Sequence, residues 1–158
     1  LGIVIDTAHI NKNGFWDVVE RSSDPIINSH SICRSLSDHP RNLNDEQIKA
    51  IAESGGVIGV NALNVVYSSD DADIVDVIRH IDHIVDLVGI EHVSIGLDFF
   101  DYIYPDDDEI AKHSGVENLN DDSEVNNLPE ALKQNGYNQN QIDDIIWNNI
   151  VEAIGRVT

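Results

Sequence analysis

The sequence is poor in cysteine and in basic residues, and each shortage excludes a class of protein. The single cysteine, Cys33, cannot form a disulfide within the chain, so nothing in the sequence indicates an oxidising compartment. We expect Cys33 to be a small buried apolar side chain rather than a reactive thiol. Lysine and arginine number 9 against 29 aspartates and glutamates, giving a formal net charge of −20. A surface this acidic repels phosphates, so we expect no nucleic-acid partner.

The same excess of negative charge bears on stability. Repulsion between like charges destabilises a compact state at low salt, whereas molar salt shortens the Debye length to about 3 Å and relieves it. A salt-adapted source and an ordinary acidic protein are both compatible with this composition. Unfolding midpoints compared between low and molar potassium chloride distinguish the two.

Long apolar runs are also missing. No stretch approaches the roughly 18 consecutive apolar residues of a membrane helix, and no basic segment is followed by the apolar core of a signal peptide. We therefore expect no membrane segment in this chain, and a cytoplasmic location. The chain begins inside an apolar run, so we expect a further part of the protein upstream of Leu1.

Short runs of β-branched residues alternate with amphipathic segments, which is typical of βα units around a parallel sheet. The runs span residues 3–6, 25–28, 56–61 and 92–98, and their nearly unbroken apolar character predicts strands buried on both faces. Helices are predicted over about 14–22, 44–54, 70–88, 129–136 and 140–154, with Asn44 as an N-cap. Four βα units are half of an eight-stranded barrel, which takes about 250 residues. The predicted fold is therefore α/β, half of a (β/α)₈ barrel, and such a half alone leaves open sheet edges.

Polar side chains follow the predicted strands at their carboxyl ends. They are His9, His30, Asn61 and Asp98, one after each strand in turn. Catalytic groups of (β/α)₈ barrels come from these ends. Imidazoles can hold Zn²⁺, and a carboxylate can take a proton from metal-bound water. Either histidine alone is more simply a hydrogen-bonded strand end, but the histidines and Asp98 together in successive units favour a metal-assisted hydrolase.

The chain resembles the membrane (renal) dipeptidase family of zinc peptidases over almost its whole length. The 21-residue separation of His9 and His30, followed by Arg41, is the most specific part of the resemblance. The matching segments are Ile5-Asp6-Thr7-Ala8-His9, Pro25 through His30-Ser31, Asp38-His39-Pro40-Arg41-Asn42-Leu43, Asp82-His83-Ile84 and Gly96-Leu97-Asp98-Phe99.

The resemblance implies that residues 1–158 are the C-terminal half of a single dipeptidase barrel domain. It implies that His9 and His30 ligate one zinc of a two-zinc site, and that Arg41 holds the free carboxylate of the dipeptide. Asp98 would bond the zinc-bridging hydroxide and pass its proton to the leaving amine. The remaining ligands and a further histidine near the substrate would come from the upstream half, so we expect this chain alone to be inactive.

Three functions stay open. The leading one is zinc-dependent hydrolysis of dipeptides; a second keeps the metal barrel but acts on another small amide or a lactam. Arg41 discriminates between them, because its role demands a free carboxylate next to the scissile bond. The third is a non-catalytic barrel fragment or subunit that needs a partner chain. A homodimer is a further expectation.

Several residues depart from the family pattern or are expected to be structural. The second aspartate of the usual Asp-Phe-Asp-Gly motif is displaced to Asp101, and the Gly-Asn-x-x-Arg motif near the end is replaced by Asn148-Asn149-Ile150-Val151-Glu152. We expect the acidic run at 106–109 to be solvated loop. The histidines outside the predicted site are expected to be structural or on the surface, and both tryptophans are expected in the core. These residues are His39, His80, His83, His92, His113, Trp16 and Trp147. His39 is expected to position the loop of Arg41, with contact to the substrate as the alternative.

Overall fold

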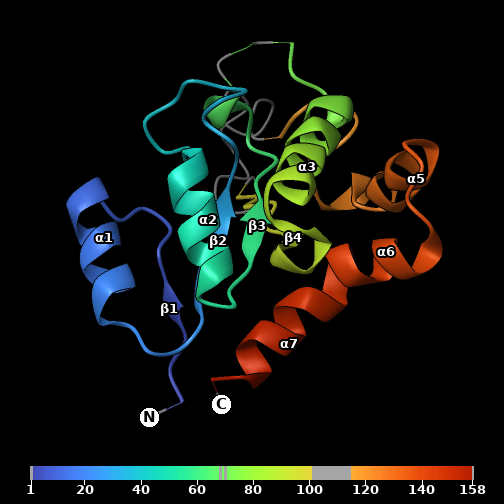
Figure 1. The fold of residues 1–158 in the computed structure, drawn as a ribbon. Helices are drawn as coiled ribbons and strands as arrows, with labels where there is room; N and C mark the ends of the chain where they lie inside the picture. The colour runs from blue at the N-terminus through green and yellow to red at the C-terminus, as the bar shows by residue number, and fades with distance from the viewer. Residues whose placement is uncertain (1, 68, 70, 101–114, 158) are drawn as a thin grey trace.

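The computed structural model describes residues 2–67, 69, 71–100 and 115–157. The four predicted strands form one parallel sheet in the order β1-β2-β3-β4, and a helix follows each of the first three strands (Figure 1). The strands are β1 (Ile5–Asp6), β2 (Ile26–Ser31), β3 (Ile58–Val60) and β4 (Val93–Ile95). The helices are α1 (Lys12–Arg21), α2 (Asp45–Glu53), α3 (Ile74–Val88), α5 (Asn127–Gln134), α6 (Gln139–Asp143) and α7 (Asn149–Gly155). The predicted α/β fold with part of a parallel barrel is confirmed.

The helices begin where their sequences provide caps. Asn44 caps α2 as predicted, and its side chain exchanges hydrogen bonds with Gln47 in a capping box. Asp73 and Asp76 form the same arrangement at the start of α3. Each cap satisfies backbone N–H groups that have no partner inside the helix.

The core lies between the sheet and the helices α2 and α3, which pack side by side over it (Figure 1). Ile48 and Ile51 of α2 and Ile81 of α3 are fully buried, as is typical of the apolar face of an amphipathic helix. Ile26 and Ile58 contribute from the strands. Burying each such side chain stabilises the fold by about 1.5–3 kcal/mol before entropy is counted.

The second strand is irregular where it approaches the predicted site. Asn28 pairs with Ile58 and Ser31 with Val60, so β2 carries one extra residue between these pairs. The carbonyl of Ser29 occupies the space that a Cβ at Gly59 or Gly96 would need. Glycines are therefore required on β3 and just after β4 for the bulge in β2 to fit.

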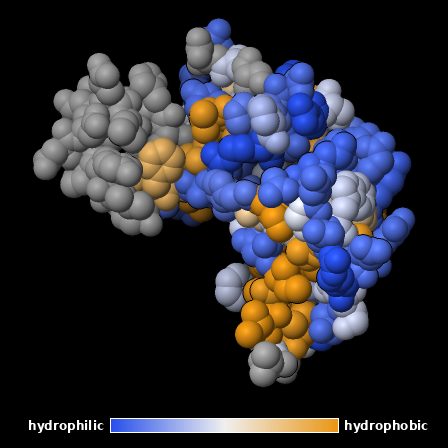
Figure 2. All heavy atoms as spheres, turned by 90° about the vertical axis from the view of Figure 1, so that its left-hand side faces the viewer, coloured by the Kyte–Doolittle hydropathy of each residue, from blue (hydrophilic) through white to orange (hydrophobic). Residues whose placement is uncertain are grey.

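The first strand differs from its prediction. It is limited to Ile5–Asp6 and both residues are exposed, whereas burial on both faces was expected. The reason is that, within the described part of the chain, β1 pairs with β2 alone and forms an edge of the sheet. Ile3 is 69% exposed and Ile5 40%. Figure 2 views this side of the molecule and shows apolar side chains gathered on its lower part.

The predicted last helix exists but contains a π-helical turn, Asp144–Asn148, between α6 and α7. The prediction that Trp147 belongs to the core is wrong, because this residue is 66% exposed to solvent. Ile142, Ile145, Asn149 and Ala153 are buried at helical spacing, and Trp147 lies on the helical face away from them. Trp16 packs partly buried against the core. Asn149 is buried and donates to the carbonyls of Ile90 and Val93, which ties α7 to β4.

Of the helices in the described part of the chain, none is long and apolar enough to cross a bilayer. Asp101, the acidic run at 106–109 and His113 lie outside the described residues. His92 is half-buried rather than a free surface side chain, since its Nδ1 lies 2.8 Å from the carbonyl oxygen of Gly56.

Candidate functional site

The two predicted site histidines converge at the carboxyl end of the sheet. His9 follows β1 and His30 lies in β2, and their Nε2 atoms are 2.7 Å apart. Their ring centroids are 4.8 Å apart, with the rings tilted by 58°. A contact this short between two imidazole nitrogens is favourable only with a proton or a metal ion between the lone pairs.

Asp98 joins the pair from the segment after β4. Its Oδ2 lies 3.7 Å from Nε2 of His30 and 4.0 Å from Nη2 of Arg41. The side-chain amide of Asn61 donates to the same oxygen at 3.4 Å. The carboxyl ends of β2, β3 and β4 thus place an imidazole, an amide and a carboxylate around one point. The polar residues at the ends of the predicted strands had indicated this arrangement.

The backbone is strained at His9 and at Asp98. Of the non-glycine residues that the structure describes, His9, Asp98 and Asn118 have positive φ, at 60°, 63° and 64°. This left-handed conformation costs a non-glycine residue about 1–3 kcal/mol and concentrates at functional sites. Two of the three are predicted site residues, and the sequence contains no signal for this.

Arg41 reaches the cluster from the loop between β2 and α2. Its Nη2 lies 3.1 Å from Nε2 of His9, and the side chain remains 36% exposed. The loop is fixed by buried Asn42, whose amide donates to the carbonyls of Ser37 and Val66. Nδ1 of His39 accepts from the backbone N–H of Arg41 at 3.3 Å. This contact agrees with the predicted role of His39 in shaping the loop.

Asn61 was noted in the sequence only as a polar strand end, and Tyr67 was missed. Asn61 is 1% exposed, and its backbone carbonyl accepts from the hydroxyl of Tyr67 at 2.6 Å. Its Oδ1 accepts from the N–H of Leu63, which turns its amide toward Asp98. A polar residue in an otherwise apolar strand is the one signal that pointed to Asn61.

A second set of polar contacts behind His30 was not predicted. The hydroxyl of Ser29 donates to Oδ2 of Asp6 at 2.6 Å and lies 2.8 Å from Nδ1 of His30. Burial raises the pKa of the Asp6 carboxyl, but hydrogen bonds from the Ser29 hydroxyl and the N–H groups of Ala8 and Ser29 outweigh it, and the pKa is lowered overall. Asp6 is therefore a carboxylate at neutral pH.

Burial also decides the charge of His30. It lowers the pKa of this imidazole, as do His9 and Arg41, and the carboxylates of Asp98 and Asp6 only partly oppose the effect. The pKa of His30 is lowered overall, so the ring is neutral at pH 7. Neutral imidazole is the form that ligates metals.

A cleft of about 280 Å³ opens beside the cluster. His9, His30 and Arg41 border it, together with Phe15 of α1 and Gln47 of α2. The two imidazoles and the guanidinium are therefore accessible from solvent through this cleft.

The described residues supply some, but not all, of the ligands that a metal ion needs. His9 and His30 offer two imidazole nitrogens at one point, beside the carboxylate of Asp98. Across residues 2–67, 69, 71–100 and 115–157, no group of three or more histidine, cysteine, aspartate or glutamate side chains is placed to hold a metal ion.

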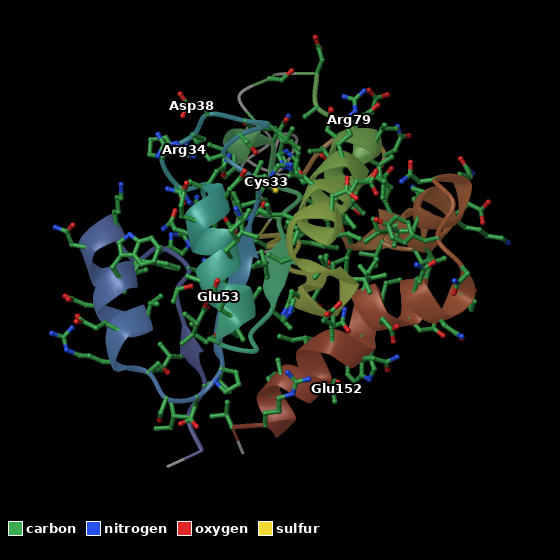
Figure 3. The ribbon with its side chains drawn as sticks, viewed as in Figure 1. Cys33, Arg34, Asp38, Glu53, Arg79 and Glu152 are labelled. Carbon is green, nitrogen blue, oxygen red and sulfur yellow. The ribbon has the colours of Figure 1, made fainter. Side chains whose placement is uncertain are left out.

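The histidines of α3 lie away from the cluster. His80 is 3% exposed, and its Nδ1 accepts from the backbone N–H of Cys33 (Figure 3 labels Cys33 beside α3). His83 lies 3.0 Å from Asp45 of α2. Both are structural, as predicted. Cys33 is buried as predicted, and burial, reinforced by the negative charge of Asp45, raises the pKa of its thiol to about 12.

His80 predicts a pH dependence of stability. Burial lowers the pKa of His80 to about 4, with Asp76 opposing and His83 adding to the shift. Between pH 6.5 and 4 the unfolded chain binds a proton that the folded chain does not, so the free energy of unfolding falls as the pH falls through this window, by up to about 3 kcal/mol. Above pH 6.5 the contribution is constant. Urea denaturation of wild type and His80→Gln over pH 4–8 measures it: the loss on acidification should be smaller in the variant, and equal losses would contradict the assignment.

Comparisons with known proteins show the family of this chain. The model of the family described as membrane dipeptidase (peptidase family M19) matches residues 1–158. An uncharacterised protein of the pqqA 5′ region of Klebsiella pneumoniae is 33% identical over 99% of this chain, which covers 56% of that protein. The dipeptidase tcpJ of Claviceps purpurea is 25% identical over 99% of this chain and 35% of its own length.

A solved structure shows the same fold. It is a metallopeptidase from Rhodobacter sphaeroides liganded with a phosphinate mimic of the dipeptide L-Ala-D-Ala, and it superposes with a TM-score of 0.86 at 26% identity. The match covers 99% of this chain and 43% of that one. The chain thus spans about half the length of the proteins it matches.

Proposed function

The chain belongs to the membrane dipeptidase family, peptidase family M19, and from this premise we propose that the protein containing it hydrolyses dipeptides with the help of zinc. The observation that carries the proposal is the convergence of His9, His30, Arg41 and Asp98 on one point at the carboxyl end of the sheet. Relatives of this chain are named dipeptidases or metallopeptidases, which supports the same reaction class.

His9 and His30 would hold one of two zinc ions through their Nε2 atoms. Bound zinc supplies a Lewis acid that polarises the peptide carbonyl and makes water a better nucleophile. His30 is neutral and both nitrogens face one point, which suits them to this task.

Arg41 and Asp98 would act on the substrate. The planar guanidinium of Arg41 offers paired donors to the free carboxylate of a dipeptide, and this side chain borders the cleft. Oδ2 of Asp98 would accept a proton from the attacking water and pass it to the nitrogen of the leaving amine. The amide of Asn61 keeps this oxygen beside His30.

We further propose that residues 1–158 form the C-terminal half of a single barrel domain and require an upstream half. The sheet ends at β1, which is exposed, and an unpaired strand edge is a place where further strands add. The upstream half would bring the remaining zinc ligands. The homodimer and the cytoplasmic location expected from the sequence stay predictions.

The test compares this chain alone with the chain mixed with its upstream half. We expect about two zinc ions per complex and hydrolysis of L-Ala-D-Ala or L-Ala-L-Ala only in the mixed sample, with loss on chelation and recovery on adding zinc. Turnover by the chain alone would refute the incomplete site. A mixed sample without metal would favour the non-catalytic subunit, and turnover of dipeptide amides or lactams as fast as dipeptides would favour the second hydrolase.

A further inference from the structure

Behind the two imidazoles, a short path of hydrogen bonds links β1 to the far side of the His30 ring. Oδ2 of Asp6 accepts from the Ser29 hydroxyl at 2.6 Å, and the same hydroxyl oxygen lies 2.8 Å from Nδ1 of His30. Neither Asp6 nor Ser29 touches the point where the imidazoles meet. Any effect on that point must therefore pass through His30.

The protons along this path can be assigned from the chemistry of the groups. A carboxylate only accepts, so the single hydroxyl proton of Ser29 is directed to Asp6. The oxygen of Ser29 is then left to accept, and Nδ1 of His30 must be the donor. A neutral imidazole with its proton on Nδ1 carries its lone pair on Nε2, the nitrogen that faces His9.

We propose that Asp6 and Ser29 are positioning residues that hold His30 in the tautomer whose Nε2 lone pair is ready for a metal ion. The inference rests on the proposed function and deepens it, because it explains how a ligand already assigned to zinc is prepared. Partners of this kind fix the orientation and tautomer of metal-binding histidines, and removing them typically weakens metal binding by about 10- to 100-fold.

The backbone holds the path in place. Oδ1 of Asp6 accepts from the backbone N–H of Ser29 at 2.9 Å and from that of Ala8 at 3.0 Å. Asp6 thereby fixes the turn that leads to His9 as well as the bulge that presents His30. The Ser29 carbonyl, set against Gly59 and Gly96, keeps the bulge from shifting.

Asp6→Asn tests the proposal with little change of shape. An asparagine keeps Oδ1 for the two backbone N–H groups, but it can place an NH₂ group where Oδ2 accepted from Ser29. Ser29 would then accept from this NH₂ and donate to Nδ1 of His30, which moves the imidazole proton to Nε2. A wrong tautomer with intact geometry is the expected outcome.

The experiment measures Zn²⁺ affinity of the complete protein by competition with a chromophoric chelator. We expect Asp6→Asn and Ser29→Ala to weaken binding about 10- to 100-fold, and Ser29→Thr, which keeps the hydroxyl, to stay near wild type. Asp17→Asn is the matched control, since it removes the same charge from an exposed carboxylate paired with Arg21 on α1. Circular dichroism confirms that each variant is folded.

A second readout separates the tautomer from a general structural effect. In zinc-free protein at pH 8, ¹⁵N NMR should show the His30 proton on Nδ1 in wild type and on Nε2 in Asp6→Asn. Equal zinc affinities of wild type and both variants, or an Nε2-protonated ring in wild type, would overturn the inference. A wild type that binds no zinc but shows the Nδ1 proton would overturn the proposed function and leave the assignment of the positioning residues supported.

Discussion

Asp98→Asn is expected to lower kcat of the complete protein about 10²- to 10⁴-fold while KM for a dipeptide changes little. Asparagine has the same shape as aspartate, but its side chain cannot take a proton from water. Its oxygen can still accept from the Asn61 amide, so the side chain should stay beside His30. The loss therefore reports proton transfer rather than misfolding.

Steady-state kinetics of L-Ala-D-Ala hydrolysis measure this effect. Asp38→Asn is the matched control, because Asp38 is 84% exposed and pairs with Arg34 in the loop outside the cluster (Figure 3). The control should retain wild-type kcat. If Asp98→Asn kept kcat within a factor of about three, the proton-transfer role would have to be assigned to another group.

Arg41→Lys is expected to raise KM about 10- to 100-fold with a smaller change in kcat. The substitution keeps the positive charge but loses the planar pair of donors that matches a carboxylate. A hydrogen bond to a charged group contributes about 1.5–3 kcal/mol, which corresponds to a loss of this size. Because lysine keeps the positive charge, the variant tests the paired hydrogen bonds to the carboxylate and not the electrostatic attraction alone.

A dipeptide amide, which lacks the free carboxylate, completes the test. Wild type and Arg41→Lys are each assayed with the dipeptide and with its amide, which gives a double-mutant type of cycle. Wild type should prefer the acid strongly, and Arg41→Lys should prefer it much less. Arg79→Lys is the control, since Arg79 pairs with Asp76 on α3 and is 69% exposed. An undiminished preference for the acid in Arg41→Lys would assign carboxylate binding elsewhere.

The elements that the sequence predicted best are those set by local patterns. The N-cap of α2 and the amphipathic pattern of α3 depend on residues three or four positions apart, and both appear where expected. The carboxyl ends of parallel strands meet at one edge of a sheet, so the places of His9, His30, Asn61 and Asp98 at the ends of the four predicted strands were enough to predict their convergence.

What the sequence did not reveal depends on contacts between distant segments. Asp6 and Ser29 are 23 residues apart, and nothing in either segment indicates that a hydrogen bond joins them. The exposure of Ile5 follows from its place at the sheet edge, and that of Trp147 from its place on the helical face away from buried Ile145 and Asn149. The amide of Asn61 gains its partner only when β3 and β4 lie together.

The left-handed backbone at His9 and Asp98 has a consequence for evolution in the laboratory. If each position costs the folded state about 1–3 kcal/mol, glycine there would relieve it and raise the melting temperature. A selection for heat resistance alone would then favour losing the imidazole or the carboxylate. Thermal tolerance and turnover would be traded against each other at these two residues, and improved variants that keep both side chains should gain their stability elsewhere in the chain.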